Sequence, residues 1–122
     1  MSPRPVIRIR IVLREGLALG PGKADLLAAI GEHGSIAAAG RSMGMSYQRA
    51  WSLVDELNRC FRSPVVEVSR GGAAHGGARL TTVGREVLST YRSVEEKAAR
   101  HCETEVERFR RLAPPEGRDA PG

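Results

Sequence analysis

A short polar stretch near the middle of the chain concentrates side chains that can hydrogen-bond to phosphates and base edges. Arg49 could bind a guanine through two hydrogen bonds and Gln48 an adenine, which are favoured pairings in a DNA major groove. Ser46 and Tyr47 could bind phosphates, and Ser52 lies just beyond them. Each of these residues alone could simply be solvated surface, and for a lone arginine that is the better interpretation. Their clustering favours a nucleic-acid contact.

Basic side chains elsewhere add weaker candidates. Arg41 could contact a phosphate with lower specificity. Arg70, His75 and Arg79 surround a glycine-rich run that either lets the backbone approach a phosphate or only makes a flexible hairpin. Contact is favoured for Arg70, and the two interpretations are even for His75. The full candidate set is Ser35, Arg41, Ser46, Tyr47, Gln48, Arg49, Ser52, Arg70, His75 and Arg79.

No arrangement of residues predicts catalysis or metal binding. His33, His75 and His101 are scattered, and two cysteines are too few for a disulfide framework. Cys102 neighbours His101, but adjacent residues on a helix point in different directions. Cys60 is better placed for packing than for nucleophilic chemistry. We therefore predict no catalytic residues, no metal and no cofactor.

Composition predicts one basic globular domain. The 122 residues carry a formal charge of +5, with 41% hydrophobic and 4% aromatic residues, so aliphatic side chains must build the core. Residues 1–80 hold eleven Lys/Arg and six Asp/Glu, whereas residues 81–122 hold eight of each. The basic excess belongs to the first two-thirds and permits nucleic-acid binding. With no long apolar run and no signal-peptide core, we expect a soluble cytoplasmic protein.

The N-terminal third predicts a strand followed by a helix. Val6–Leu13 alternates with period two, which is typical of a strand with one buried face. The buried face would hold Ile7, Ile9, Ile11 and Leu13, and the opposite face Arg8 and Arg10. A Gly-Pro-Gly turn precedes a helix over Lys23–Glu32. Gly34 would end this helix and Ser35 would cap the next one.

Residues 35–60 predict two short helices joined by a tight turn. The apolar spacing requires a steep crossing, and Gly40 is small where the helices would approach most closely. Gly44 fits a left-handed residue at the turn, and Ser46 can cap the second helix, which runs to about Cys60. The buried stripe of that helix would be Ala50, Leu53, Val54 and Leu57. This is a helix-turn-helix pattern whose second helix would be the recognition helix.

A hairpin and a long helix would complete the fold. Val65–Arg70 and Ala78–Thr81 predict two strands around the glycines, which is the wing of a winged helix. The predicted fold class is therefore mostly α with small β (α+β). An apolar repeat from Thr82 to Leu112 predicts one helix of about 45 Å, far longer than the radius of gyration of about 13 Å for a domain of this size. Such a helix would overhang its domain, which predicts a homodimer.

The predicted dimer face follows this apolar repeat. It comprises Val87, Tyr91, Val94, Ala98, Cys102, Val106 and Phe109. Two prolines end the helix, so we expect a winged helix-turn-helix domain over residues 1–112 and a disordered tail over residues 113–122.

Several of these motifs resemble the DNA-binding domain of the ModE family of molybdate-responsive transcriptional regulators. The resemblance lies in Gly34-Ser35-Ile36, in the run from Gly44 to Trp51, in Leu57-Asn58, and in the glycine-rich wing with Leu80-Thr81 and Gly84. It covers roughly residues 6 to 100. The Ser-Tyr-x-x-Ala-Trp run is distinctive, and the rest is also similar to LysR-type domains.

The resemblance implies a sequence-specific regulator that binds palindromic double-stranded DNA operators. It also implies a homodimer formed through the N-terminal strand and the long helix. Members of the family usually carry C-terminal molybdate-binding domains, which would begin where this sequence ends. We therefore do not expect this chain alone to bind molybdate. Regulation would be independent of that effector, or another chain would supply the sensing.

Two other functions remain open at this point. A winged-helix surface can bind protein instead of DNA, although the polar and basic start of the second helix favours DNA. Alternatively, the protein could bind an oxyanion such as molybdate at a dimer interface, although no residue specifically places such a site.

Overall fold

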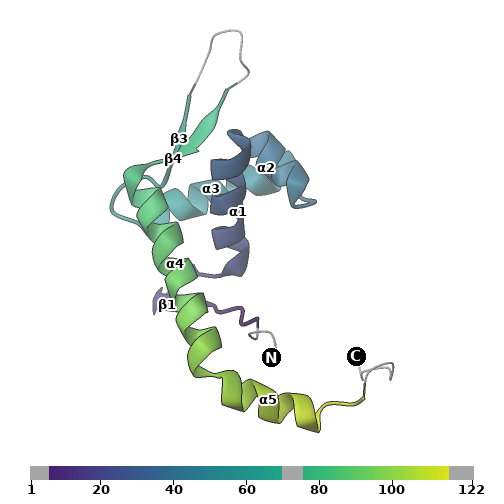
Figure 1. Ribbon diagram of the computed structural model, residues 1–122. Coiled ribbons are helices and arrows are strands. Elements are labelled where there is room, and N and C mark those ends of the chain that lie inside the picture. The colour runs from purple at the N-terminus through teal and green to yellow at the C-terminus, as the bar shows by residue number, and fades with distance from the viewer. Residues whose placement is uncertain (1–5, 70–75, 116–122) are drawn as a thin grey trace.

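The computed structural model describes residues 6–69 and 76–115 of the chain (Figure 1). The helices in these residues are α1 (Pro21–His33), α2 (Ile36–Ser42), α3 (Tyr47–Cys60), α4 (Thr82–His101) and α5 (Glu103–Leu112). The strands are β1 (Ile11–Arg14), β2 (Leu17–Leu19), β3 (Val66–Val68) and β4 (Ala78–Leu80). The architecture is mostly helical with two antiparallel hairpins, which confirms the predicted α+β winged-helix class.

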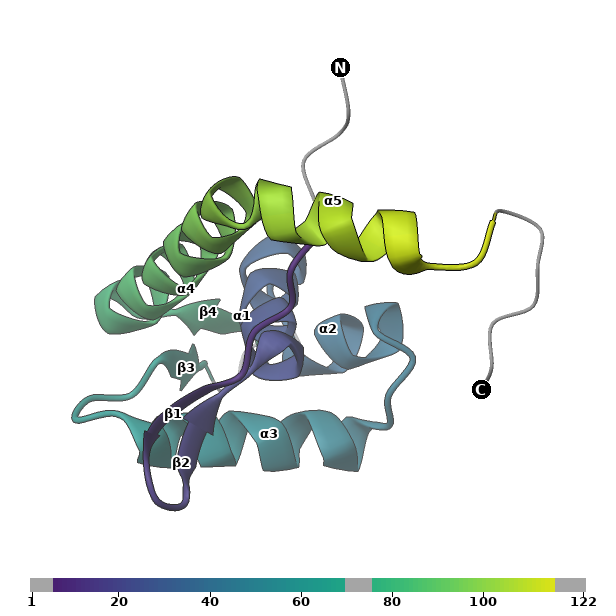
Figure 2. The same ribbon diagram turned by 90° about the horizontal axis from the view of Figure 1, so that it is seen from below.

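Helix α1 lies at the centre of the fold. It contacts α2, α3 and α4, and its Leu26, Leu27 and Ile30 are completely buried. Leu57 of α3 and Tyr91 of α4 are among the other large buried side chains. Figure 2 shows α3 and α5 on opposite sides of α1. The core thus fixes α3 relative to α1 and leaves α5 at the far side.

The helix-turn-helix has the predicted caps and turns. The Ser35 Oγ accepts a hydrogen bond from the Ala38 N–H at 3.0 Å, and the Ser46 Oγ accepts one from the Arg49 N–H at 3.1 Å. Gly34 and Gly44 have φ values of 73° and 69°, which glycine adopts without steric cost. These local signals set where α1 ends and where α2 and α3 begin.

Close packing between α2 and α3 also follows the prediction. A Cβ atom added to Gly40 would lie 3.1 Å from the Cβ of Ala50, so a larger residue would push the helices apart. Ala50, Leu53, Val54 and Leu57 are all buried, as the stripe on α3 predicted.

The N-terminal strand is shorter than predicted. Instead of one strand over Val6–Leu13, β1 pairs with β2 in a hairpin whose register shifts between Val12 and Arg14. Ile7, Ile9 and Ile11 are partly buried as expected. Leu13 is 52% exposed, because the irregular register interrupts the alternation of faces.

The prediction of one continuous helix from Thr82 to Leu112 is wrong, because the chain bends at Cys102. This residue has φ −105° and ψ 13°, and it separates α4 from α5 (Figure 1). Arg100 and His101 lie in the last turn of α4, and Glu103 and Glu105 in the first turn of α5. Cations favour a helix C-terminus and anions an N-terminus, so this charge pattern stabilises two shorter helices.

None of the helices in the described ranges combines the length and apolar character that a membrane span requires.

Candidate nucleic-acid interface

The start of α3 presents a polar surface on a rigid base. Tyr47 is 56% exposed, and Gln48, Arg49 and Ser52 are also exposed. The buried stripe on the opposite face holds the helix against α1 and α2. The capped end adds the positive end of the helix dipole, which favours an approaching phosphate. The structure therefore brings together the α3 residues that the sequence singled out.

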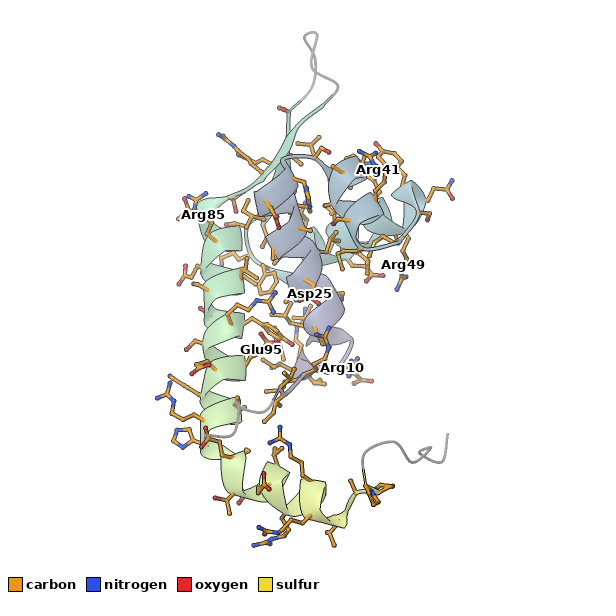
Figure 3. The ribbon with its side chains drawn as sticks, turned by 45° about the vertical axis from the view of Figure 1, so that its right-hand side comes forward. Arg10, Asp25, Arg41, Arg49, Arg85 and Glu95 are labelled. Atoms are coloured by element: carbon orange, nitrogen blue, oxygen red, sulfur yellow. The ribbon has the colours of Figure 1, made fainter. Side chains whose placement is uncertain are left out.

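The positive charge of this surface is not neutralised within the described residues. Arg49 extends outward from α3, and Arg41 lies on neighbouring α2 (Figure 3). Neither guanidinium forms a hydrogen bond or ion pair with any residue that the structure describes. Residues 34–54 contain no Asp or Glu. Both arginines can therefore bind an external anion without first breaking an internal contact.

Trp51 supports the surface from below. The centroids of the Trp51 and Tyr47 rings lie 6.1 Å apart, and the angle between the ring planes is 76°. Trp51 also packs against the hydrophobic core. The edge-to-face contact limits the rotamers of Tyr47, and Trp51 has a packing role. A groove beside the pair is lined by Ser35, Val68 and Gly77, among others, and separates the helices from the base of the wing.

Asn58 attaches the wing to the end of α3. Its Oδ1 accepts hydrogen bonds from the N–H groups of Val65 at 2.8 Å and Val66 at 3.1 Å, and its Nδ2 donates to the Val66 carbonyl at 3.3 Å. Reasoning from residue types gave Asn58 no role of its own. The available signal was an amide placed directly beside buried Leu57 at a helix end, where it can bind the backbone of the chain that follows the helix.

The wing is anchored at two further points. The Ala78 N–H donates to the Gly34 carbonyl at 2.8 Å, which connects β4 to the turn before α2. Thr81 donates from its hydroxyl to the Pro64 carbonyl at 2.7 Å, and its Oγ1 accepts from the Gly84 N–H at 2.9 Å. The wing base is consequently held by α1, α3 and α4 together.

Three predicted contacts on the wing have different outcomes. Arg79 of β4 is paired across the hairpin with Glu67 of β3, Nε to Oε2 at 2.9 Å, so part of its charge is already neutralised. Its side chain remains 81% exposed. Arg70 and His75 lie outside the described residues.

Ser35, the remaining candidate, acts as the α2 cap, and its hydroxyl can still donate a hydrogen bond.

The predicted dimer residues divide between the core and the surface. Tyr91 is only 1% exposed, and its hydroxyl donates a hydrogen bond to the Ile9 carbonyl. Its assignment to a dimer face was wrong, because the N-terminal segment of the same chain already covers it. Val87 packs against the same core. The members that keep exposed surface are Val87, Val94, Ala98, Cys102, Val106 and Phe109.

A charged cluster lies away from this surface, between α1 and α4. Asp25 accepts hydrogen bonds from Arg8 at 3.0 Å and from Arg92 at 2.9 Å, and Arg92 also donates to Glu95 at 2.8 Å. Burial raises the pKa of Asp25, but the two arginines outweigh it, so the pKa lies below its usual 3.8. Hydrogen bonds to Glu95 and Asp25 raise the pKa of Arg92. Burial raises the pKa of Tyr91 beside them.

The remaining reactive groups in residues 6–69 and 76–115 do not form a common centre. Within the described residues, no three His, Cys, Asp or Glu side chains lie close enough to share a metal ion. Cys60 and Cys102 are both free thiols and partly buried.

Comparison with known proteins finds relatives named for molybdenum-pterin binding, molybdenum transport or transcriptional regulation. The chain is 41% identical over 90 residues to the molybdenum-pterin-binding protein MopB of Rhodobacter capsulatus, which covers 74% of this chain and 33% of MopB. It is 38% identical over 94 residues to the molybdenum transport protein ModE of Azotobacter vinelandii, covering 77% and 35%. It is 33% identical over 85 residues to the DNA-binding transcriptional dual regulator ModE of Escherichia coli, covering 70% and 32%.

The chain belongs to the ModE family. It corresponds to the N-terminal domain of that family and spans about a third of the length of these relatives. No family model matches the chain. The identities to MopB and to the ModE proteins confirm the resemblance seen in the motifs.

Proposed function

We propose that this ModE-family chain is a sequence-specific DNA-binding domain of a transcriptional regulator that acts as a homodimer on two-fold symmetric operators. The observation that carries the proposal is the start of α3, where Gln48 and Arg49 are exposed on a helix locked by its cap and core stripe. Arginine and glutamine are suited to reading guanine and adenine in the major groove. The name of the E. coli relative, a DNA-binding regulator, agrees with this role.

The remaining contacts would position the domain on the duplex. Arg41, Ser46 and Tyr47 border the same surface and supply phosphate contacts that carry no sequence information. Binding should therefore weaken steeply as salt concentration rises. The exposed apolar residues of α5 would join two copies, so that two α3 helices read two half-sites.

The first experiment is selection of bound sequences from a random duplex pool, with and without molybdate. Enrichment of an inverted repeat supports a dimeric regulator. A motif that changes with molybdate would show sensing by this chain itself. Salt-sensitive binding without enrichment would contradict sequence-specific recognition and favour a protein-binding or architectural role.

Arg49→Ala tests the reading helix directly. We expect affinity for the selected site to fall about 10- to 100-fold, because a bidentate contact discriminates by roughly 1–3 kcal/mol per base. Fluorescence anisotropy on specific and random duplexes measures the change. The matched control is Arg111→Ala, which removes the same charge from exposed α5. Equal affinities for Arg49→Ala and the original protein would refute the role of Arg49.

A further inference from the structure

The contacts of Asp25 join the part of the fold that would read DNA to the part that would join two copies. Asp25 lies on α1, whose apolar side chains hold α2 and α3. Its Oδ1 accepts from Arg92 of α4 at 2.9 Å, and its Oδ2 accepts from Arg8 of the N-terminal segment at 3.0 Å. A single carboxylate therefore bridges α1, α4 and the segment before β1. In Figure 3 Asp25 and Glu95 face each other across the gap between α1 and α4.

Two hydrogen bonds fix the orientation of the Arg92 guanidinium in this bridge. One terminal nitrogen donates to Glu95 on the same helix at 2.8 Å, and the other donates to Asp25. Glu95 is only 18% exposed, so the planar guanidinium is held on both sides. Tyr91 lies one residue before Arg92 on α4, and its hydroxyl donates a hydrogen bond to the Ile9 carbonyl. This bond attaches the N-terminal segment to the same point of α4. These contacts restrain rotation and sliding of α4 along α1.

We propose that Asp25 is a positioning residue that fixes the direction of α4 relative to the reading helix and thereby sets the spacing between operator half-sites. This inference rests on the proposed function. If two copies meet through α4 and α5, the angle between α1 and α4 determines the distance and rotation between the two α3 helices. One base pair inserted between half-sites rotates the second site by roughly a tenth of a helical turn, so a rigid arm rejects it and a loose arm tolerates it.

The test compares operators that differ only in the length between their half-sites. The operator selected by the original protein is prepared with one base pair added or removed at its centre, and as a single half-site. Asp25→Asn keeps the size of the side chain and removes its charge. We expect the preference for the native spacing to fall about tenfold, because the hydrogen bonds from Arg8 and Arg92 to a charged carboxylate are stronger than those to a neutral amide. Affinity for the single half-site should stay unchanged.

Two further variants keep the test decisive. Arg92→Met removes the Arg92–Asp25 contact from the α4 side, and combining it with Asp25→Asn should add little, because both variants disrupt this shared hydrogen bond. Arg100→Gln is the matched control, since it breaks the exposed Arg100–Glu96 pair within α4. It should retain the preference for the native spacing. Arg92→Met also replaces Asp25→Asn if the latter does not fold.

The outcomes separate this inference from the proposed function. An original protein that selects no paired site would contradict the proposed dimeric regulator. A strong spacing preference that survives both Asp25→Asn and Arg92→Met would overturn the role of Asp25. Equal losses on the half-site and on the paired site would also overturn it, because the bridge would then act on α3 itself and not on the relation between two copies.

Discussion

The helix-turn-helix with its wing and the C-terminal helix α5 are built in opposite ways. In the first region α1, α2 and α3 share a continuous core, and each turn between them has a cap or a glycine. In α5 no residue is buried, and Phe109 and Leu112 are 70% and 78% exposed. The first region can satisfy its own apolar and polar groups, whereas α5 leaves its apolar side chains in water. A partner surface is therefore expected on α5 and not on the core of the domain.

The close packing of the first region extends to the place where the wing meets α4. The first turn of α4 lies directly against the backbone of Val65, with Gly84 at the contact. A Cβ atom at this position would overlap the Val65 carbonyl oxygen. No flexible side chain is available to move, so the backbone itself would have to shift.

Gly84→Ala should have the largest effect on stability. We expect a loss of about 3 kcal/mol or more, because overpacking against rigid backbone has no inexpensive relaxation. Urea unfolding followed by circular dichroism measures the loss. Gly22→Ala in α1 is the matched control, since nothing lies within 4 Å of its added Cβ. If the two alanine variants were equally stable, the tight contact between α4 and Val65 would be disproved.

Asn58→Ala should have the next largest effect. The N–H groups of Val65 and Val66 would lose their acceptor, which costs roughly 1–3 kcal/mol when such groups are removed from water. Denaturant unfolding gives the stability, and hydrogen exchange of these two amides shows whether the wing base opens.

Asn58→Asp serves as the rescue for that prediction. An aspartate keeps an oxygen acceptor for both N–H groups, but it loses the 3.3 Å bond to the Val66 carbonyl and places a carboxylate oxygen beside that carbonyl. It should recover part of the stability that alanine loses. Losses of the same size for alanine and aspartate would show that the amide bridge does not hold the wing.

Substitutions on α5 should change association while leaving the fold nearly unaffected. In the double variant Phe109→Ser with Leu112→Ser we expect unfolding of the domain to change by less than about 0.5 kcal/mol, because both side chains are already exposed. Self-association should weaken about tenfold or more, since burial of each large apolar side chain contributes roughly 1.5–3 kcal/mol. Analytical ultracentrifugation over a range of concentrations measures it.

Arg108→Ser is the control on the same helix, because it replaces an exposed charged side chain. A double variant that dimerises as tightly as the original protein would place the contact between copies elsewhere. Loss of stability in the double variant would instead show that α5 packs within one chain.

Much of the fold could be predicted because its signals are local. Ser35 and Ser46 bind N–H groups three residues away, and Gly34 and Gly44 adopt conformations that their own lack of a side chain permits. The exposed start of α3 followed from the apolar spacing on the same helix. The bend at Cys102 also had a local signal, the change from basic to acidic residues across it, which the continuous apolar repeat outweighed in the prediction.

The amino-acid sequence by itself determined the order of the elements from α1 to the start of α4, the helix-turn-helix and the face of α3 that carries Gln48 and Arg49, since these depend on neighbours within a few residues. Only the tertiary structure decided that Arg79 pairs with Glu67, that Asn58 holds the wing, and that the N-terminal segment covers Tyr91. The same is true of the Asp25 bridge, whose partners lie 17 and 67 residues away. Such contacts depend on how the chain closes its long-range loops, and neither periodicity nor local propensity encodes that distance.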